Sequence, residues 1–243
     1  MSVSLGALRA FVLRVVRRGW RAVRHEWRAV VVRPLRRLWE RGLRGVSLAV
    51  FGALAVIGLH AFQQTGVGGG VVGFVGEVRG DQPLWVTLLR TPVSMFVPAV
   101  DLPVWGGLPR LLLAFALAEL LFGRIRTLAV AYTVTLAGTL GARLMVALGP
   151  ERLGGLPADV AHAVDTGTSA AIVGLFAYTS VALRAPLLFL AAVVPTVTGS
   201  IRDLDLAGRE HLIAVAVAVA IGGVLHRRSG QVVVERPAVV GGP

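Results

Sequence analysis

The chain has 243 residues, of which 55% are hydrophobic and only 16% are charged, and its mean hydropathy is +0.74. These values are typical of a protein that crosses a membrane several times, and the length leaves no room for a substantial soluble domain. The sequence contains no cysteine, which excludes disulfides, thiolate metal sites and cysteine catalysis.

The net charge of +12 comes from 25 basic residues, all of them arginine, and twelve of these lie in residues 1–45. The charge therefore belongs to one terminal segment and not to a nucleic-acid-binding face, so we expect no nucleic-acid partner. Apolar residues recur between these arginines at three- and four-residue spacing, beside three tryptophans. This pattern predicts an amphipathic helix, broken at Pro34, that lies on the inner leaflet and binds anionic lipids. A plain topology anchor is the alternative.

Six apolar runs follow, and each predicts a membrane-spanning helix. They cover residues 46–62, 108–122, 128–148, 169–183, 187–201 and 212–225. The segment 63–105 holds too many glycines and prolines for a span, which predicts a long loop with short surface helices. The last three runs are shorter than the usual length of about 20 residues, so a re-entrant hairpin over 169–201 is an alternative.

Charge alternates along this map. Arginine dominates in 1–45, 123–127, 184–186 and 227–243, whereas acidic residues at least balance it in the other connections. By the positive-inside rule, both termini are cytoplasmic. We expect a multi-pass protein of a bacterial cell membrane with a basic tail (1–45), a membrane domain (46–226) and a short C-terminal tail (227–243).

Two polar residues stand at the start of apolar runs on the same, outer side of this map. Ser169 opens the fourth span and His211 opens the sixth. Small residues repeat along both runs and would let the two helices approach closely. The stripes are Ala170, Gly174, Ala177 and Val181 on one run, and Ala214, Ala218 and Gly222 on the other. A pair built this way would use His211 as the general base for Ser169.

Each residue also has a purely structural interpretation. A serine in a membrane helix usually bonds its own backbone or a neighbouring helix, and His211 follows Arg209 and Glu210 in a polar stretch. His60 and His162 are rival bases on the same side. Asp165, four residues before Ser169, would either orient an imidazole or cap the fourth helix.

The order of short motifs resembles the rhomboid intramembrane serine proteases over residues 46–226. The matching segments are Ser94-Met95-Phe96, Leu120-Leu121-Phe122-Gly123, Tyr132 to Gly138, Gly167-Thr168-Ser169, and His211 with Gly222 and Gly223. The resemblance implies an all-α bundle of six transmembrane helices. It also implies a Ser169/His211 dyad that cleaves transmembrane substrates near the outer face without a cofactor, with Gly167, Thr168 and Ala170 supporting the oxyanion.

The chain departs from that family at several positions. The two polar residues that usually help to form the oxyanion hole fall on Leu111 and Phe115, and the residue after the nucleophile is Ala170 instead of glycine. Ile213 and Val215 stand where glycines are expected after the histidine. Loss of one side-chain donor to the oxyanion typically lowers the catalytic rate about 10²–10³-fold. Two interpretations therefore stay open: a slow protease, and an inactive relative that binds transmembrane clients.

A third class is a small transporter or channel subunit. Arg110, Glu119 and Arg143 are charged residues inside apolar runs, and such charges often mark transport pathways, although they also snorkel to the nearer interface. The sequence has no internal repeat or pair of broken helices to support transport. Metal, nucleotide and haem motifs are absent from it, so we expect no cofactor.

Overall fold

The computed structural model describes residues 5–78, 82–98, 104–152, 154–157, 167–203 and 205–234, and these are almost entirely helical. In chain order the main elements are α1 (Leu5–Trp27), π-helical η1 (Arg28–Val32), α2 (Arg33–Arg41), 3₁₀-helical η2 (Gly42–Val46), α3 (Ser47–Gln63), α4 (Gly68–Gly76), α5 (Leu84–Ser94), α6 (Val104–Phe122), α7 (Arg124–Leu148), α8 (Thr168–Leu183), α9 (Pro186–Leu188), π-helical η4 (Phe189–Val193), α10 (Val194–Arg202) and α11 (Leu206–Val234).

Within the described part of the chain, four helical stretches are long and apolar enough to cross a membrane. They are Arg17–Gln63, which includes α3, and Val104–Phe122, Arg124–Leu148 and Leu206–Leu225. Thr168–Leu183 and Pro186–Arg202 are shorter apolar helices. The predictions of an all-helical membrane protein and of short helices within the 63–105 loop (α4 and α5) are therefore confirmed.

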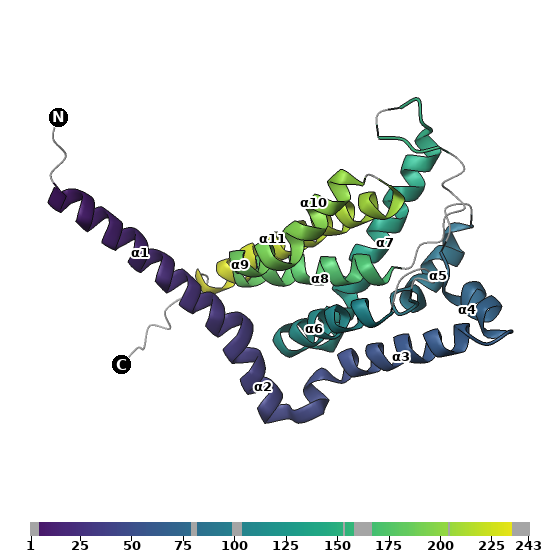
Figure 1. Cartoon of the computed structure of the whole chain (residues 1–243), viewed down its shortest axis with the longest axis horizontal. Helices are drawn as coiled ribbons and strands as arrows, with labels where there is room; N and C mark the ends of the chain where they lie inside the picture. Colours follow the sequence, from purple (N-terminus) through teal and green to yellow (C-terminus); the bar gives the residue numbers. More distant parts are fainter. Residues whose placement is uncertain are drawn as a thin grey trace, which may run out of the picture.

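The helices pack side by side, and α1 projects away from them (Figure 1). We use "tail end" for the end of the bundle where α2 meets α6, and "loop end" for the end where α5 and the start of α8 lie. The core is made of apolar side chains, mostly alanine, valine, leucine and aromatic residues, that come mainly from α3, α6, α7, α8 and α11. Its largest fully buried members are Tyr178, Phe115, Leu111 and Leu175.

Two expectations about helix limits were wrong: the start of the last helix and the break at Pro34. α11 begins at Leu206 and not with the apolar run at 212, because Asp205 caps it: Oδ1 of Asp205 accepts the N–H of Gly208 at 2.7 Å. α11 also continues to Val234, so the C-terminal tail at 227–243 is helical in its first part. At the other end of the chain, the N-terminal helix is not broken at Pro34.

Pro34 is the second residue of α2 and has no N–H to donate to the turn before it. The π-helical turn η1 precedes it and keeps the helix continuous from Leu5 to Arg41. The chain changes direction instead at Gly42, whose φ of +57° lies in the left-handed region that favours glycine.

Glu119 ties α6 to the start of α3 at the tail end. Its carboxylate is buried, and it accepts the N–H groups of Leu48 and Ala49 at 2.8 and 3.2 Å. The hydroxyl of Ser47 donates to the same carboxylate, and the guanidinium of Arg124 lies 3.0 Å from it. Glu119 thus serves as an N-cap from another helix and places a negative charge at the positive end of α3.

Two further side chains tie the basic tail to the bundle. Arg37 of α2 donates to the carbonyls of Leu120 and Leu121 at 2.6 and 3.1 Å, which satisfies the C-terminal end of α6. Glu26 of α1, only 6% exposed, accepts the N–H groups of Leu187 and Leu188 at 3.1 and 2.6 Å. The tail therefore caps both α6 and α9, and it is part of the folded bundle at its tail end.

Replacing Glu119 with glutamine should lower stability by about 3 kcal/mol, because it leaves Arg124 and the start of α3 without their buried anion. Thermal unfolding in detergent measures this change. Glu40→Gln is the matched control, since Glu40 forms an exposed pair with Arg36 four residues earlier and such a pair contributes only about 0.3–0.5 kcal/mol. Equal unfolding midpoints for the two variants would contradict the capping role of Glu119.

Candidate active site

Ser169 and His211 lie within hydrogen-bonding distance at the loop end. Oγ of Ser169 is 2.8 Å from Nε2 of His211. Ser169 belongs to the first turn of α8 and is exposed, whereas His211 lies in the second turn of α11 and is half-buried. The structure therefore brings together the two residues that the sequence singled out, although α11 begins five residues before the histidine.

The segment before Ser169 is anchored to α5 and to the residues that follow it. Oγ1 of Thr168 donates to the carbonyl of Val97 at 2.9 Å. Gly167 is buried against α7 and α5: a Cβ added there would lie 2.3 Å from Cγ2 of Thr135 and 3.1 Å from Oγ of Ser94. Only glycine fits at position 167, because the neighbouring side chains come so close. These contacts fix the start of α8 and therefore the position of Ser169 in its first turn.

The small-residue stripes meet as expected. Ala170 and Ala177 of α8 and Ala214 and Ala218 of α11 are almost completely buried. Gly222 permits a close approach, because a Cβ at this position would lie 3.0 Å from a methyl group of Val181. The two helices pack along their lengths through these residues, and this packing sets the separation of Ser169 from His211.

α7 supports the other side of α11 through two glycines. A Cβ at Gly138 would lie 3.2 Å from the carbonyl oxygen of Glu210, and one at Gly141 would lie 2.3 Å from Cδ1 of Ile213. The bulk of Ile213, where a glycine was expected from the family pattern, is therefore accommodated by the absence of bulk at Gly141.

Leu111 and Phe115, at the expected oxyanion positions, are core residues with 1% and 0% of their surface exposed. Phe115 packs against Phe96 with ring centroids 5.7 Å apart. Neither side chain can donate a hydrogen bond. Any donor to an oxyanion beside Ser169 must therefore come from elsewhere, and the backbone N–H groups in the first turn of α8 (Thr168, Ser169, Ala170) are the nearest by sequence.

Three other residues were predicted to belong to the site: His60, His162 and Asp165. His162 and Asp165 lie outside the described residues. His60 is in the last turn of α3, and the imidazole that meets Ser169 is that of His211. Among the described residues there is no group of three metal-ligating side chains.

Two of the three charges considered for transport have structural partners. Glu119 caps α3, and Arg143 donates to the hydroxyl of Thr87 at 3.1 Å and to the carbonyl of Gln82. Arg143 therefore holds α5 against α7. Arg110 is exposed near the start of α6.

Ser200 is a site residue that the sequence did not indicate. It is buried in the last turn of α10, and its Oγ lies 3.4 Å from Nδ1 of His211. Nothing in the surrounding Thr-Val-Thr-Gly-Ser sequence distinguishes it from an ordinary polar helix end. Its relation to His211 depends on how α10 folds back on α11.

No family model, no curated protein and no solved structure significantly matches the chain.

Gly167→Ala should destabilise the protein by about 1–3 kcal/mol, because the added methyl group overlaps Cγ2 of Thr135. Combining it with Thr135→Ser removes that methyl and should restore most of the loss in a thermal unfolding experiment. Gly223→Ala is the control, since a Cβ at this position meets nothing within 4 Å. Failure of Thr135→Ser to restore stability would show that the contact with Thr135 does not determine the glycine.

Proposed function

We propose that this protein is a rhomboid-like intramembrane serine protease, built on six transmembrane helices, that cleaves transmembrane substrates near the outer face of a bacterial cell membrane. The observation that carries the proposal is the 2.8 Å contact between Oγ of Ser169 and Nε2 of His211. A nucleophile hydrogen-bonded to a base is the arrangement that activates serine. Ser169 is also exposed, so substrate and water can reach it.

The proposed reaction runs through an acyl-enzyme. Nε2 of His211 removes the proton of the Ser169 hydroxyl as Oγ attacks the scissile carbonyl carbon. The imidazolium then gives this proton to the leaving amine as the C–N bond breaks. A water molecule, deprotonated by His211, attacks the ester, and the released Ser169 oxygen regains its proton.

The developing oxyanion would be stabilised by the first turn of α8. The N–H groups of Thr168, Ser169 and Ala170 stand at the positive end of that helix, and N–H groups in this position have no partner within the helix. With Leu111 and Phe115 buried and apolar, this backbone contribution replaces side-chain donors. We therefore expect a slower enzyme than one that has both.

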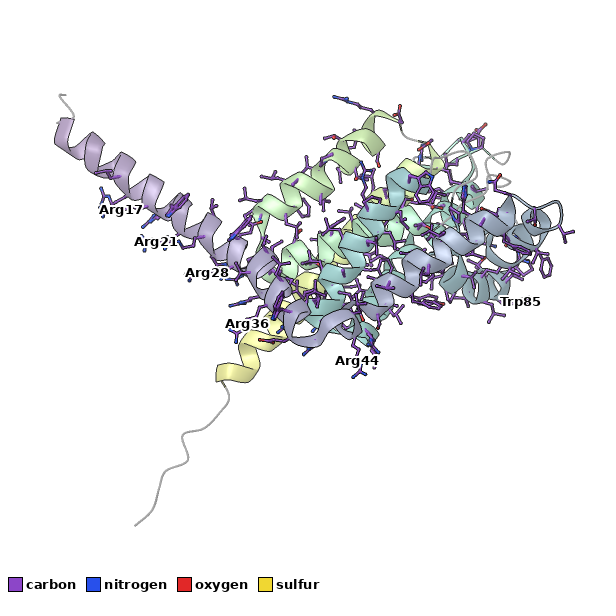
Figure 2. All side chains as sticks on the ribbon, turned by 60° about the horizontal axis from the view of Figure 1, so that its bottom comes forward. Arg17, Arg21, Arg28, Arg36, Arg44 and Trp85 are labelled. Carbon is purple, nitrogen blue, oxygen red and sulfur yellow. The ribbon has the colours of Figure 1, made fainter. Side chains whose placement is uncertain are left out.

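The surface supports a membrane location. Large apolar side chains are exposed on the outside of the bundle: Leu54, Leu113, Leu144 and Val224. Exposed tryptophans occur towards both ends, and Figure 2 shows Trp85 far from the arginines of the tail. Apolar sides between aromatic ends fit a lipid bilayer with α8 and α11 opening on the outer side, opposite the basic tail.

The second candidate is an inactive relative that binds transmembrane clients. The buried Leu111 and Phe115 favour it, since they remove two hydrogen-bonding positions from the site. The intact contact between Ser169 and His211 favours the protease. A transporter or channel subunit ranks last, because Glu119 and Arg143 already hold structural positions.

Ser169→Ala and His211→Ala should each lower cleavage of a model transmembrane substrate in liposomes by about 10³-fold or more, because each removes one half of the nucleophile–base pair. The controls are Ser180→Ala, which deletes a buried hydroxyl bonded to the carbonyl of Phe176, and His60→Ala. Both should cleave at the wild-type rate. A folded wild-type protein that cleaves no substrate would favour the client-binding alternative.

We also propose that α1 binds anionic lipids of the inner leaflet. Arg17, Arg21 and Arg28 project from the same side of the N-terminal helix (Figure 2). Trp20 and Trp27 of the same helix are exposed. Arginines and tryptophans on an exposed helix are typical of binding at the lipid headgroups.

This lipid contact predicts a response of α1 to bilayer charge. The chain has no cysteine, so an environment-sensitive fluorophore on Leu13→Cys reports α1 alone. Its emission should shift to the blue in liposomes containing anionic lipid, and less so when Arg17, Arg21 and Arg28 are changed to glutamine, since each arginine contributes about 1 kcal/mol. Identical spectra in neutral and anionic liposomes would contradict lipid binding.

A further inference from the structure

His211 has a serine hydroxyl near each of its ring nitrogens. Nε2 lies 2.8 Å from Oγ of Ser169, and Nδ1 lies 3.4 Å from Oγ of Ser200. To accept the proton of Ser169, Nε2 must be unprotonated, so the neutral ring must carry its proton on Nδ1. For His211 to act as a base through Nε2, a hydrogen-bond acceptor near Nδ1 is needed to hold the proton there. Oγ of Ser200 lies in that position.

We propose that Ser200 is a positioning residue for His211: its Oγ accepts a hydrogen bond from Nδ1–H and keeps the imidazole in the tautomer whose Nε2 faces Ser169. The inference rests on the proposed hydrolase function and adds a third member to its site. A contact of 3.4 Å is long for a hydrogen bond. It shortens when His211 takes the proton, because hydrogen bonds from a charged donor are shorter and stronger.

The fold holds Ser200 in place without help from the substrate. Only 5% of its surface is exposed, and it lies in the last turn of α10, three residues before Asp203 begins the turn into α11. Gly208 allows the start of α11 to lie close to the end of α10, because a Cβ at this position would lie 2.4 Å from the carbonyl oxygen of Asp203 and 3.0 Å from that of Ser200. His211 is three residues after Gly208 and so shares its helix face.

The π-helical turn η4 determines which face of α10 carries Ser200. η4 (Phe189–Val193) lies between α9 and α10 in one apolar helical segment, Pro186–Arg202. A π turn inserts extra backbone relative to an α-helix and so rotates every later side chain about the axis. Ser200, which follows this turn, lies near His211, and interruptions of this kind are frequent at functional sites.

Ser200 is poorly placed to be the nucleophile itself. It is buried, whereas Ser169 is exposed, and its contact with the ring is the longer of the two. Its burial keeps it from touching a substrate. A serine-directed phosphonate distinguishes the two roles for Ser200: it should attach to Ser169 if Ser200 only positions His211, and to Ser200 if that residue is the nucleophile.

The first test measures the tautomer of His211 in the resting protein. Nitrogen-15 spectra of histidine-labelled wild type in detergent, with the His211 signals assigned by their loss in His211→Gln, should show a protonated Nδ1 and an unprotonated Nε2. In Ser200→Ala the form with the proton on Nε2 should gain population, and Ser200→Thr should restore the wild-type spectrum. This readout does not require activity, so it separates failure of the inference from failure of the proposed function.

The second test is kinetic. Ser200→Ala should lower kcat about 2–10-fold, the range expected for loss of one hydrogen bond, and should leave KM unchanged because Ser200 does not reach the substrate. Ser200→Thr should recover kcat. The matched control is Ser180→Ala, another deletion of a buried serine hydroxyl, which should change neither constant.

Three results would overturn the proposal. The His211 tautomer could be the same in wild type and Ser200→Ala. The kcat of Ser200→Ala could equal that of wild type. The phosphonate could be attached to Ser200 instead of Ser169.

Discussion

The candidate site depends on how closely α11 can approach α8 and α7. Glycines remove bulk at points where these helices touch: Gly222 meets Val181, and Gly138 meets the backbone of Glu210. A larger side chain at either position would push α11 outward. The 2.8 Å contact between Ser169 and His211 is therefore a consequence of helix packing below it, and it needs no stabilising energy of its own.

At the opposite end of the bundle, charged side chains bind the ends of helices. Glu119 and Glu26 each accept two backbone N–H groups at a helix start, and Arg37 binds the carbonyls at the end of α6. These side chains satisfy groups that would be costly to leave unpaired in an apolar setting. Glu26 also connects the basic tail to the helical segment Pro186–Arg202, which carries Ser200, so the tail and the candidate site share one element.

The sequence predicts much of this architecture, because hydrophobic runs and small-residue spacing are local patterns. The apolar helices and the small-residue stripes could be derived from it. The pairing of Ser169 with His211 was a hypothesis that rested on the predicted topology and on a family resemblance. The start of α11 could not, because the cap by Asp205 outweighs the polar Arg209 and Glu210 that suggested a loop. The capping roles of Glu26 and Glu119 were missed because each acts on a helix far away in the sequence, 161 residues away for Glu26. Ser200 was missed because its contact with His211 depends on how α10 folds back on α11.

The most direct measurement of the central claim is the site and rate of labelling by a serine-directed phosphonate in liposomes. Peptide mapping by mass spectrometry should find the adduct on Ser169, and labelling should fall to the background rate in His211→Ala while that protein stays folded. Labelling of Ser169 at the same rate without His211 would contradict a working dyad. So would a folded wild-type protein that takes up no label.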